Sequence, residues 1–230
     1  MVEKYPEIAL ERFDKANFWI LYFVFKIRKF LKDGILEVGA GCGSFTRGYM
    51  KNFQSITLTD MDNSNYNLLK KNFINKKNIN VLNSKIEDID NKFNTLLYFN
   101  VLEHVKEDKL EIKNALEKLN YGGYLIILVP AHQKIYSKLD KAVGHYKRYD
   151  INFFKENKFE NSEIVKLHFL DFLGYFLYHL NKIFFKNETY PTALKIFIWD
   201  KISTPITIIV DFLTGYKFGK NILCIYRKTS

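Results

Sequence analysis

The sequence of 230 residues predicts an α/β fold in which a mostly parallel, seven-stranded sheet carries helices on both faces. Two observations lead to this prediction. Short runs of apolar and β-branched residues alternate with longer segments of helical periodicity, and strands separated by helices pair in parallel. A glycine-rich turn also follows the first apolar run, as it does where such sheets bind nucleosides. At this length the chain suits one domain, 1–230.

The N-terminal segment, 1–33, is expected to form one amphipathic helix, because apolar and aromatic residues recur at helical spacing from 8 to 32. We expect this helix to lie over the top of the sheet, near the ligand pocket. Its apolar stripe fits a lid over a cofactor, and it equally fits packing against the core. The uncharged apolar run 18–25 is far shorter than the ~20 residues that a membrane span needs.

The first strand, 35–38, is followed by the turn 39–43, which has glycines at alternate positions. These glycines let the backbone turn tightly and approach a ligand that any Cβ would block. The next strand, 55–59, ends at Asp60, 21 residues after the first glycine, where a carboxylate can accept hydrogen bonds from ribose hydroxyls. A dinucleotide fingerprint needs glycine or alanine at position 44, but Ser44 stands there, so a pyrophosphate is not the favoured ligand.

The same patterns continue to the end of the chain. Further strands are expected at 79–83, 94–99, 123–129, 162–170 and 221–227, with helices at 44–52, 63–76 and 106–118.

An aromatic-rich insertion, 171–218, separates the last two strands. Lysines interrupt it too often for a bilayer span, and Pro191 and Pro205 are expected to break its helices. Apolar bodies with cationic rims are typical of a helical hairpin at a membrane interface or over a lipidic substrate. The alternatives are an extra core layer and a homodimer face.

Four ordered segments together resemble class I S-adenosylmethionine-dependent methyltransferases. Residues 37–43 are similar to motif I of that family, and Asp60 to its ribose acid. Residues 93–105 are similar to its fourth strand and "vLEHv" segment, and 119–130 to its "LkpGGyLvi-vP" turn into strand five. The resemblance covers 35–130 and implies a Rossmann-like fold with a cofactor-binding core, 34–130, and a terminal antiparallel hairpin. It also implies an enzyme that uses S-adenosylmethionine and releases S-adenosylhomocysteine.

The resemblance also implies which residues hold the cofactor. Glu37 is expected to order the loop or meet the methionine ammonium, with a structural helix-terminus role as the alternative. Lys85 replaces the acid that receives adenine in the family, so the backbone N–H of Ile86 and the side chain of Glu87 or Asp88 are expected to take its place. The expected cofactor residues are Glu37, Gly39, Ala40, Gly41, Gly43, Asp60, Met61, Ile86, Glu87, Asn100 and Val101.

A second motif follows the fifth strand, within the C-terminal segment 131–230. Residues 139–149 are similar to an "LD-x(3)-GH-x-RRY" segment of small methyltransferases found with glycan and lipid-linked sugar pathways. An imidazole here could take a proton from an attacking hydroxyl or amine, and the adjacent cations could clamp a phosphate or carboxylate. The alternatives are a solvated basic loop and, for the histidine after strand four, a packing role. The catalytic candidates are His145, His104 and Tyr149, and the substrate-binding candidates are His132, Tyr146, Lys147 and Arg148.

Composition limits the environment and the partners. The net charge of +10 favours polyanions, whether nucleic acid, anionic lipid headgroups or a phosphorylated substrate, and nucleic acid ranks below the others because no recognition module is present. Cys42 and Cys224 form no framework, which favours a reducing cytosol. The histidines and cysteines lack paired ligand spacing, so no metal site is expected.

The family resemblance, taken with these observations, implies methyl transfer from S-adenosylmethionine to oxygen or nitrogen of a small, lipid-linked or sugar-linked acceptor. The protein is expected in the cytoplasm, with contact at the cytosolic face of a membrane. One alternative is an RNA or protein methyltransferase, whose RNA binding would fall steeply with salt. Another is a non-catalytic cofactor-binding or scaffold protein of the same fold.

Overall fold

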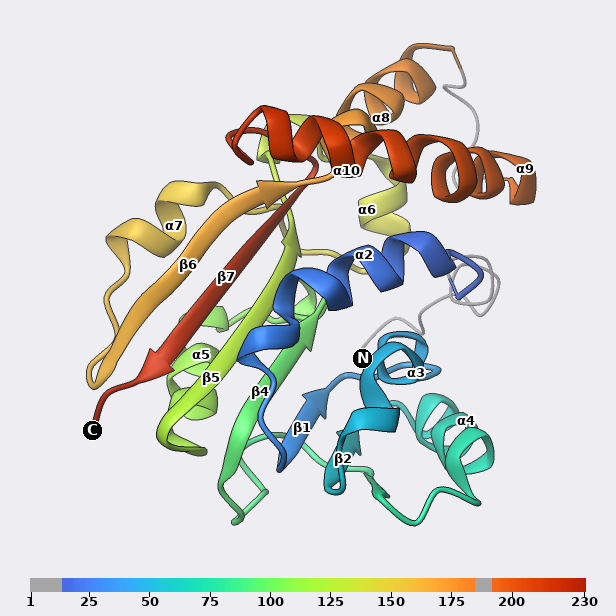
Figure 1. Cartoon of the computed structure of the whole chain (residues 1–230). Coiled ribbons are helices and arrows are strands. Elements are labelled where there is room, and N and C mark those ends of the chain that lie inside the picture. The colour runs from blue at the N-terminus through green and yellow to red at the C-terminus, as the bar shows by residue number, and fades with distance from the viewer. Residues whose placement is uncertain (1–13, 185–191) are drawn as a thin grey trace.

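A computed structural model of the chain describes residues 14–184 and 192–230. Within them, the strands form one sheet in the order β3-β2-β1-β4-β5-β7-β6 (Figure 1). The first five strands pair in parallel, and β7 pairs antiparallel with both β5 and β6. This confirms the predicted mostly parallel sheet with its terminal antiparallel hairpin. The strands are β1 Ile35–Val38, β2 Ile56–Thr59, β3 Ile79–Leu82, β4 Phe93–Phe99, β5 Leu119–Pro130, β6 Ser162–Leu170 and β7 Asn221–Lys228.

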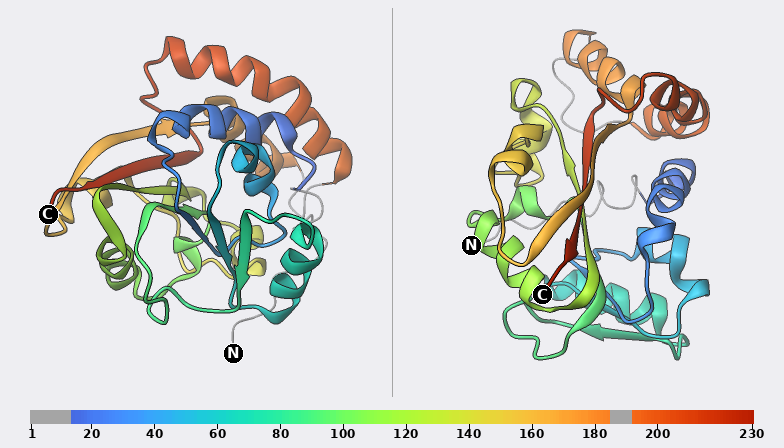
Figure 2. Two further views of the ribbon diagram at one scale, coloured as in Figure 1. Left: turned by 60° about the horizontal axis from the view of Figure 1, so that its bottom comes forward. Right: turned by 60° about the vertical axis from the view of Figure 1, so that its left-hand side comes forward.

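Helices cover both faces of the sheet, as Figure 2 shows. Successive side chains of a strand point to opposite faces, so Leu96 joins one apolar core and Leu97 the other. The face with Leu97 is covered by α2 Asn17–Ile27, α3 Ser44–Tyr49 and α4 Asn63–Phe73. The face with Leu96 is covered by α5 Asp108–Glu117 and α7 Ile151–Glu156.

The N-terminal helix is shorter than predicted, as far as the structure describes it. A turn precedes α2, a 3-10 turn at Arg28–Phe30 ends it, and positions 8–13 of the predicted helix lie outside the described residues. Phe23 and Ile27 are fully buried against the sheet, while Phe25 is exposed. The helix therefore packs on the core, as one of the two interpretations expected, and its residues Trp19 and Ile20 also line the cavity described below.

The insertion folds as helices at the edge where the parallel strands end. It contains α8 Phe172–Phe184, α9 Ala193–Phe197, a π-helical turn Ile198–Ser203 and α10 Thr204–Leu213. Pro205 does not break the helix as predicted. It occupies the first turn of α10, and the helical backbone continues into α10 through the π-helical turn before it, whose last residue, Ser203, has helical φ and ψ. Pro191 lies outside the described residues.

Two buried carboxylates fix the insertion to the rest of the fold. Asp211 of α10 accepts a hydrogen bond from the Tyr22 hydroxyl on α2 at 2.9 Å, and also from two backbone amides at the start of α8. Asp200 accepts from the backbone amide of Trp19 at 2.9 Å. The helices α2 and α10 therefore lie side by side over one end of the sheet (Figure 1).

The remaining short elements connect strands and helices, and all but Met50–Asn52, which links α3 to the start of β2, follow the carboxyl end of a strand. They are α6 Lys138–Ala142 and the 3-10 turns Met50–Asn52, Leu102–His104 and Gln133–Ile135. Across residues 14–184 and 192–230, none of the helices combines the length and the apolar character that a bilayer crossing demands.

Candidate active site

The turn after β1 adopts a backbone shape that only glycine accepts without strain. Gly39 has φ +63°, and a Cβ added there would lie 2.8 Å from Cγ2 of Val101. Gly43 has φ +80°, and a Cβ there would lie 2.3 Å from the ring of Phe73. The glycine spacing thus reflects both the positive φ and the close approach of β4's end and of α4.

Asp60 lies at the carboxyl end of β2, beside this turn. Its carboxylate accepts hydrogen bonds from the backbone amides of Gly41 and Asp62, each at 2.9 Å, and from the Asn65 side chain at 3.3 Å. Burial raises the pKa of Asp60, while these hydrogen bonds oppose the shift. A carboxylate offers about four lone-pair sites, so a ribose hydroxyl can still be received.

One cavity of about 1730 Å³ opens at this edge of the sheet. Single ligands occupy pockets of ~300–1,000 Å³, so the cavity has room for a cofactor and a second molecule. Of the expected cofactor residues, the following line it: Gly39, Ala40, Gly41, Asp60, Met61, Ile86, Glu87, Asn100 and Val101.

Glu37 and Gly43 are not among the lining residues. The buried Glu37 carboxylate accepts hydrogen bonds from Thr46 at 2.7 Å and from Tyr49 at 2.5 Å, both on α3. Burial raises the pKa of Glu37 to about 7, against the lowering effect of these two bonds. In this structure the Glu37 carboxylate therefore contacts α3, which agrees with the structural alternative, and its contact with a cofactor stays a prediction.

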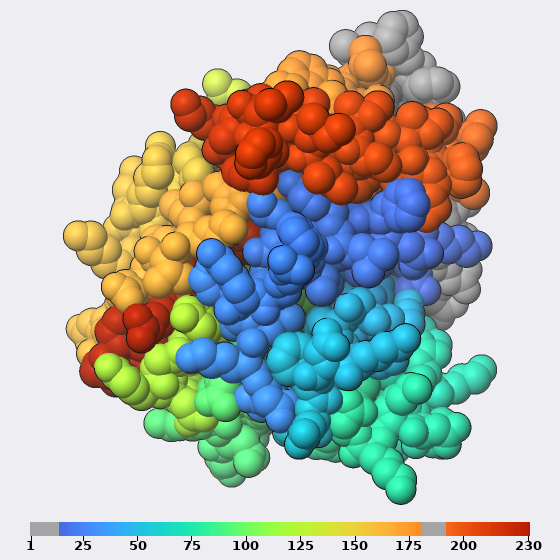
Figure 3. Space-filling view, in the orientation of Figure 1, coloured from blue at the N-terminus to red at the C-terminus, as the bar shows by residue number. Residues whose placement is uncertain are grey.

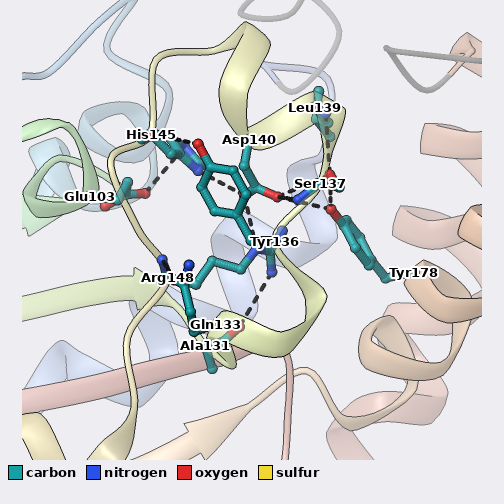
Figure 4. A network of polar contacts seen from close by, with 10 residues as sticks. All are labelled: Glu103, Ala131, Gln133, Tyr136, Ser137, Leu139, Asp140, His145, Arg148 and Tyr178. Carbon is teal, nitrogen blue, oxygen red and sulfur yellow. Dashed lines mark hydrogen bonds and ion pairs between the residues drawn. The ribbon is translucent and has the colours of Figure 1, made fainter.

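The far end of the cavity holds a polar network centred on Asp140 of α6 (Figure 4). Its carboxylate accepts from Nδ1 of His145 at 2.9 Å, from Nε of Arg148 at 2.8 Å and from the Tyr178 hydroxyl at 3.0 Å. Burial alone would raise the pKa of Asp140, but the hydrogen bond from His145 and the charge of Arg148 hold it well below its usual range. Asp140 is therefore ionised and fixes the orientation of His145.

Glu103 and His104 face this network from the turn after β4. Oε1 of Glu103 lies 3.8 Å from Nε2 of His145, and the rings of His104 and His145 meet edge to face at 4.7 Å. Burial raises the pKa of Glu103 to about 7 and lowers the pKa of His104 to about 4. The ligand atoms of these three side chains lie within 4.8 Å of one another, a grouping that sequence spacing did not predict.

Two of the substrate candidates and two of the catalytic candidates reach the cavity. Tyr146 is exposed and lines it, as do Arg148, His104 and His145. The guanidinium of Arg148 is already paired with Asp140, so its role is to hold the network.

The other three candidates are not among the lining residues. Nζ of Lys147 lies 2.6 Å from Asp108, and the buried Tyr149 hydroxyl donates to the same carboxylate at 2.7 Å. The His132 ring stacks on Phe169 and contacts the carbonyl of Gly219 at 2.9 Å. These contacts occupy the three side chains outside the cavity lining, and their predicted roles in the site gain no support from this geometry.

Sequence reasoning missed several residues of the far end. Asp140 was not a site candidate, although Ser137 three residues earlier completes a capping box with it, a pattern visible in sequence. Glu103 was not a site candidate either, although it directly precedes His104. Tyr178 and Trp199 reach the cavity from the insertion, and nothing in the sequence indicated which of its aromatic residues would do so.

Part of the sequence matches a known protein family. Residues 36–127 match a family model described as a methyltransferase domain. Among curated proteins no relative matches the sequence.

Solved structures with similar folds are methyltransferases. Coclaurine N-methyltransferase bound to N-methylheliamine and S-adenosylhomocysteine is 14% identical, with a TM-score of 0.60 over 99% of this chain and 76% of that chain. N-methyltransferase NodS from Bradyrhizobium japonicum WM9, in complex with S-adenosylhomocysteine, is 12% identical, with a TM-score of 0.57 over 100% and 91%. A chain of the complex between the Haloferax volcanii Trm112 methyltransferase activator and a methyltransferase is 10% identical, with a TM-score of 0.66 over 99% and 98%.

At these identities the solved structures establish the fold, and the family match over β1 to β5 establishes the kind of domain built on it. The cavity agrees with both, because the glycine turn and Asp60 lie where the fold binds its nucleoside. Residues 36–127 therefore match a methyltransferase domain, and the described residues adopt the fold of class I S-adenosylmethionine-dependent methyltransferases.

Proposed function

We propose that this protein transfers the methyl group of S-adenosylmethionine to oxygen or nitrogen of a lipid-linked acceptor at the cytosolic face of a membrane. The observation that carries the proposal is that one continuous cavity joins the glycine turn and Asp60 to the network of Glu103, His104 and His145. Its volume of about 1730 Å³ exceeds what one ligand fills, so donor and acceptor can meet inside it.

The donor end follows the turn after β1. Asp60 would receive the ribose, and the segment at Ile86 and Glu87 would receive the adenine. Asn100, with φ +56°, presents the backbone after β4 to the methionine portion. S-adenosylmethionine supplies the reactive methyl group, and the protein's contribution is to hold that group about 3 Å from a nucleophile.

The acceptor end lies between the turn after β4 and the segment after α6. His145 and His104 face the place where an acceptor hydroxyl or amine must lose its proton, so we assign deprotonation of the acceptor to this cluster. Lys106, Lys138 and Lys141 line the same cavity, but so do Glu107 and Glu111, so the net charge of the chain, rather than this lining, is what favours an anionic acceptor. Arg148 and Lys147 support the walls through their carboxylate partners instead.

The surface beside the cavity favours a lipid-linked acceptor. Helices α2, α9 and α10 and the π-helical turn expose many large apolar side chains, and α2 and α10 form one continuous face (Figure 3). The cavity itself is lined from the insertion by Leu177, Ile196 and Trp199. The exposed apolar residues, which we call the apolar face, are Phe18, Leu21, Phe25, Leu194, Phe197, Ile198, Ile202, Ile206, Ile208, Ile209, Phe212 and Leu213.

The charges around the apolar face are those that an anionic membrane attracts. Residues 17–30 contain no acid, and the two acids of 192–213, Asp200 and Asp211, are buried. Cations are present at both edges of the face. Aromatic and aliphatic side chains with a cationic rim are typical of helices that lie in a membrane interface.

Calorimetric titration tests the donor site. The whole chain should bind S-adenosylmethionine and S-adenosylhomocysteine, and Asp60→Ala should weaken binding about tenfold or more, because charge-assisted hydrogen bonds contribute ~1.5–3 kcal/mol. The matched control is Asp90→Ala, which removes an exposed carboxylate that does not line the cavity. A folded wild-type protein that takes up neither ligand would refute the donor assignment.

Methyl-labelled S-adenosylmethionine tests the acceptor class. After incubation with a cell extract, label should enter the lipid fraction in wild-type samples, and His145→Ala should lower this incorporation far more than it lowers donor affinity. Label found instead in RNA or protein would contradict the lipid-linked acceptor.

A further inference from the structure

The buried carboxylate of Glu103 has no hydrogen-bond partner for either oxygen, although only 1% of the residue is exposed. Burying a charged or polar group without a partner is costly, so such groups normally face a ligand, a water molecule or an ion. Glu103 lines the cavity, and the nearest cationic candidate, Nε2 of His145, lies 3.8 Å away, beyond hydrogen-bond distance.

Two imidazoles converge on the same point. His145 contacts the ionised Asp140 through Nδ1 at 2.9 Å, and its Nε2 lies 3.8 Å from Oε1 of Glu103. The His104 ring is hydrogen-bonded to the backbone of Gly144 and packs edge to face on His145. A histidine whose second nitrogen is held by a carboxylate or a carbonyl is the usual arrangement in metal sites, because the outer partner sets the tautomer and the ring orientation.

We propose that Glu103, His104 and His145 bind a divalent transition-metal ion at the acceptor end of the cavity, and that this ion holds the acceptor's oxygen or nitrogen. This inference rests on the proposed function and specifies how deprotonation is achieved there, with His145 acting as a ligand. Two imidazole nitrogens and one carboxylate suit Zn²⁺, Fe²⁺, Co²⁺ or Mn²⁺ better than Mg²⁺ or Ca²⁺, which prefer oxygen ligands.

The distances require only a modest adjustment. Ligands at ~2.0–2.1 Å from a tetrahedral ion are roughly 3.3 Å apart. The ligand atoms of this cluster lie within 4.8 Å of one another, and the closest charged pair lies at 3.8 Å. A movement of each ligand atom by about 1 Å or less, through side-chain rotation, would therefore bring the three atoms to coordination distance of one ion. Three protein ligands leave at least one coordination position toward the cavity.

Such an ion would act as a Lewis acid on the acceptor. Coordination lowers the pKa of a bound hydroxyl, whose proton leaves to solvent through the cavity. The freed lone pair forms the new bond to the methyl carbon while the carbon–sulfur bond breaks. The electron pair of the broken carbon–sulfur bond stays on sulfur, so the sulfonium becomes the neutral thioether of S-adenosylhomocysteine. The ion's charge is unchanged throughout.

Metal binding is tested on the whole, untagged chain after chelator treatment and dialysis. Titration with Zn²⁺ alone, followed by calorimetry, should show one site per chain, and Co²⁺ should give the visible absorption of a tetrahedral or five-coordinate ion. Glu103→Gln and His145→Ala should weaken binding by about tenfold to a hundredfold or more and alter the spectrum, and Asp140→Asn should act in the same range through His145.

The matched control is His168→Ala, because the His168 ring packs on Tyr216, outside the cavity lining. It should leave both the affinity and the spectrum unchanged. Absence of a one-to-one site in folded wild-type protein would overturn the inference, as would equal Zn²⁺ affinity in wild type, Glu103→Gln and His145→Ala.

Titration of S-adenosylhomocysteine in the presence of chelator separates the two proposals. If that ligand binds and Zn²⁺ does not, the metal site falls while the donor site stands. If Zn²⁺ binds and the nucleoside does not, the proposed function fails and the ion site remains.

Discussion

At the scale of single residues, Glu37 and Asp60 show how alike two acids of one motif can look in sequence and how differently the fold uses them. Both end or flank buried strands, and the family resemblance places both against the cofactor. In the structure Asp60 lines the cavity, whereas Glu37 points into the core beneath α3. Glu37 therefore contributes to the stability of the fold, and its ionisation should change the free energy of unfolding.

We expect the stability of the protein to fall as pH rises through the pKa of Glu37, which burial raises to about 7. In the unfolded chain a glutamate titrates near ~4.3. A carboxyl with a raised folded pKa contributes stability that is fully present below the unfolded pKa and lost as pH rises through the folded value. Between about pH 5 and about pH 8 the loss from Glu37 should be roughly 2–3 kcal/mol.

Urea unfolding of wild type and Glu37→Gln at both pH values measures this loss. Glutamine can still accept the bonds from Thr46 and Tyr49, so the variant should lack the pH-dependent component and otherwise fold normally. Glu160→Gln is the control, since that side chain is exposed. Parallel pH profiles for wild type and Glu37→Gln would show that Glu37 is not responsible.

At the scale of elements, sequence periodicity predicted the strands and most helices well, because each buries its own apolar pattern. The ends of the strands β1 to β5 could be predicted, because β-branched and apolar runs mark the strands and glycine turns mark where some of them begin or end. The far end of the cavity was harder to predict. His145 meets Glu103 only because α6 and the turn after β4 are brought together by the whole sheet, and short-range patterns carry no information on such meetings.

The apolar face makes an element-scale prediction. The whole chain should sediment with vesicles of phosphatidylcholine plus phosphatidylglycerol more than with phosphatidylcholine alone, and added salt should weaken this binding. Phe212→Ser combined with Leu213→Ser should reduce the partition coefficient at least tenfold. These residues are 71% and 75% exposed on α10, and each large apolar side chain contributes ~1.5–3 kcal/mol when buried.

Ile74→Ser is the matched control for vesicle binding, since Ile74 is 79% exposed but follows α4, away from the face. It should bind vesicles as wild type does. A second copy of the chain is the competing occupant of the apolar face. A dimer in light scattering that Phe212→Ser with Leu213→Ser dissolves, together with no vesicle binding, would assign the face to that second copy instead.

At the scale of the whole molecule, the C-terminal strand completes the fold. β7 lies between β5 and β6 and pairs with both along its length. Without β7, β6 has no partner strand in the sheet that the described residues form. The insertion between β6 and β7 also supplies part of the cavity wall, including Trp199. Both the sheet and the acceptor site therefore depend on pairings between residues distant in sequence.

Deletion of 221–230 should consequently abolish cooperative folding rather than trim an edge. It would leave β5 and β6 with unpaired backbone groups and would remove Ile222, Leu223 and Ile225, all fully buried. Deletion of 229–230, which lie beyond β7, should be tolerated and serves as the control. Urea unfolding followed by circular dichroism should show a sharp transition for wild type and control, and a broad one or aggregation for the longer deletion. If the longer deletion unfolds as sharply as the control, β7 contributes little to the stability of the sheet, although it lies between β5 and β6.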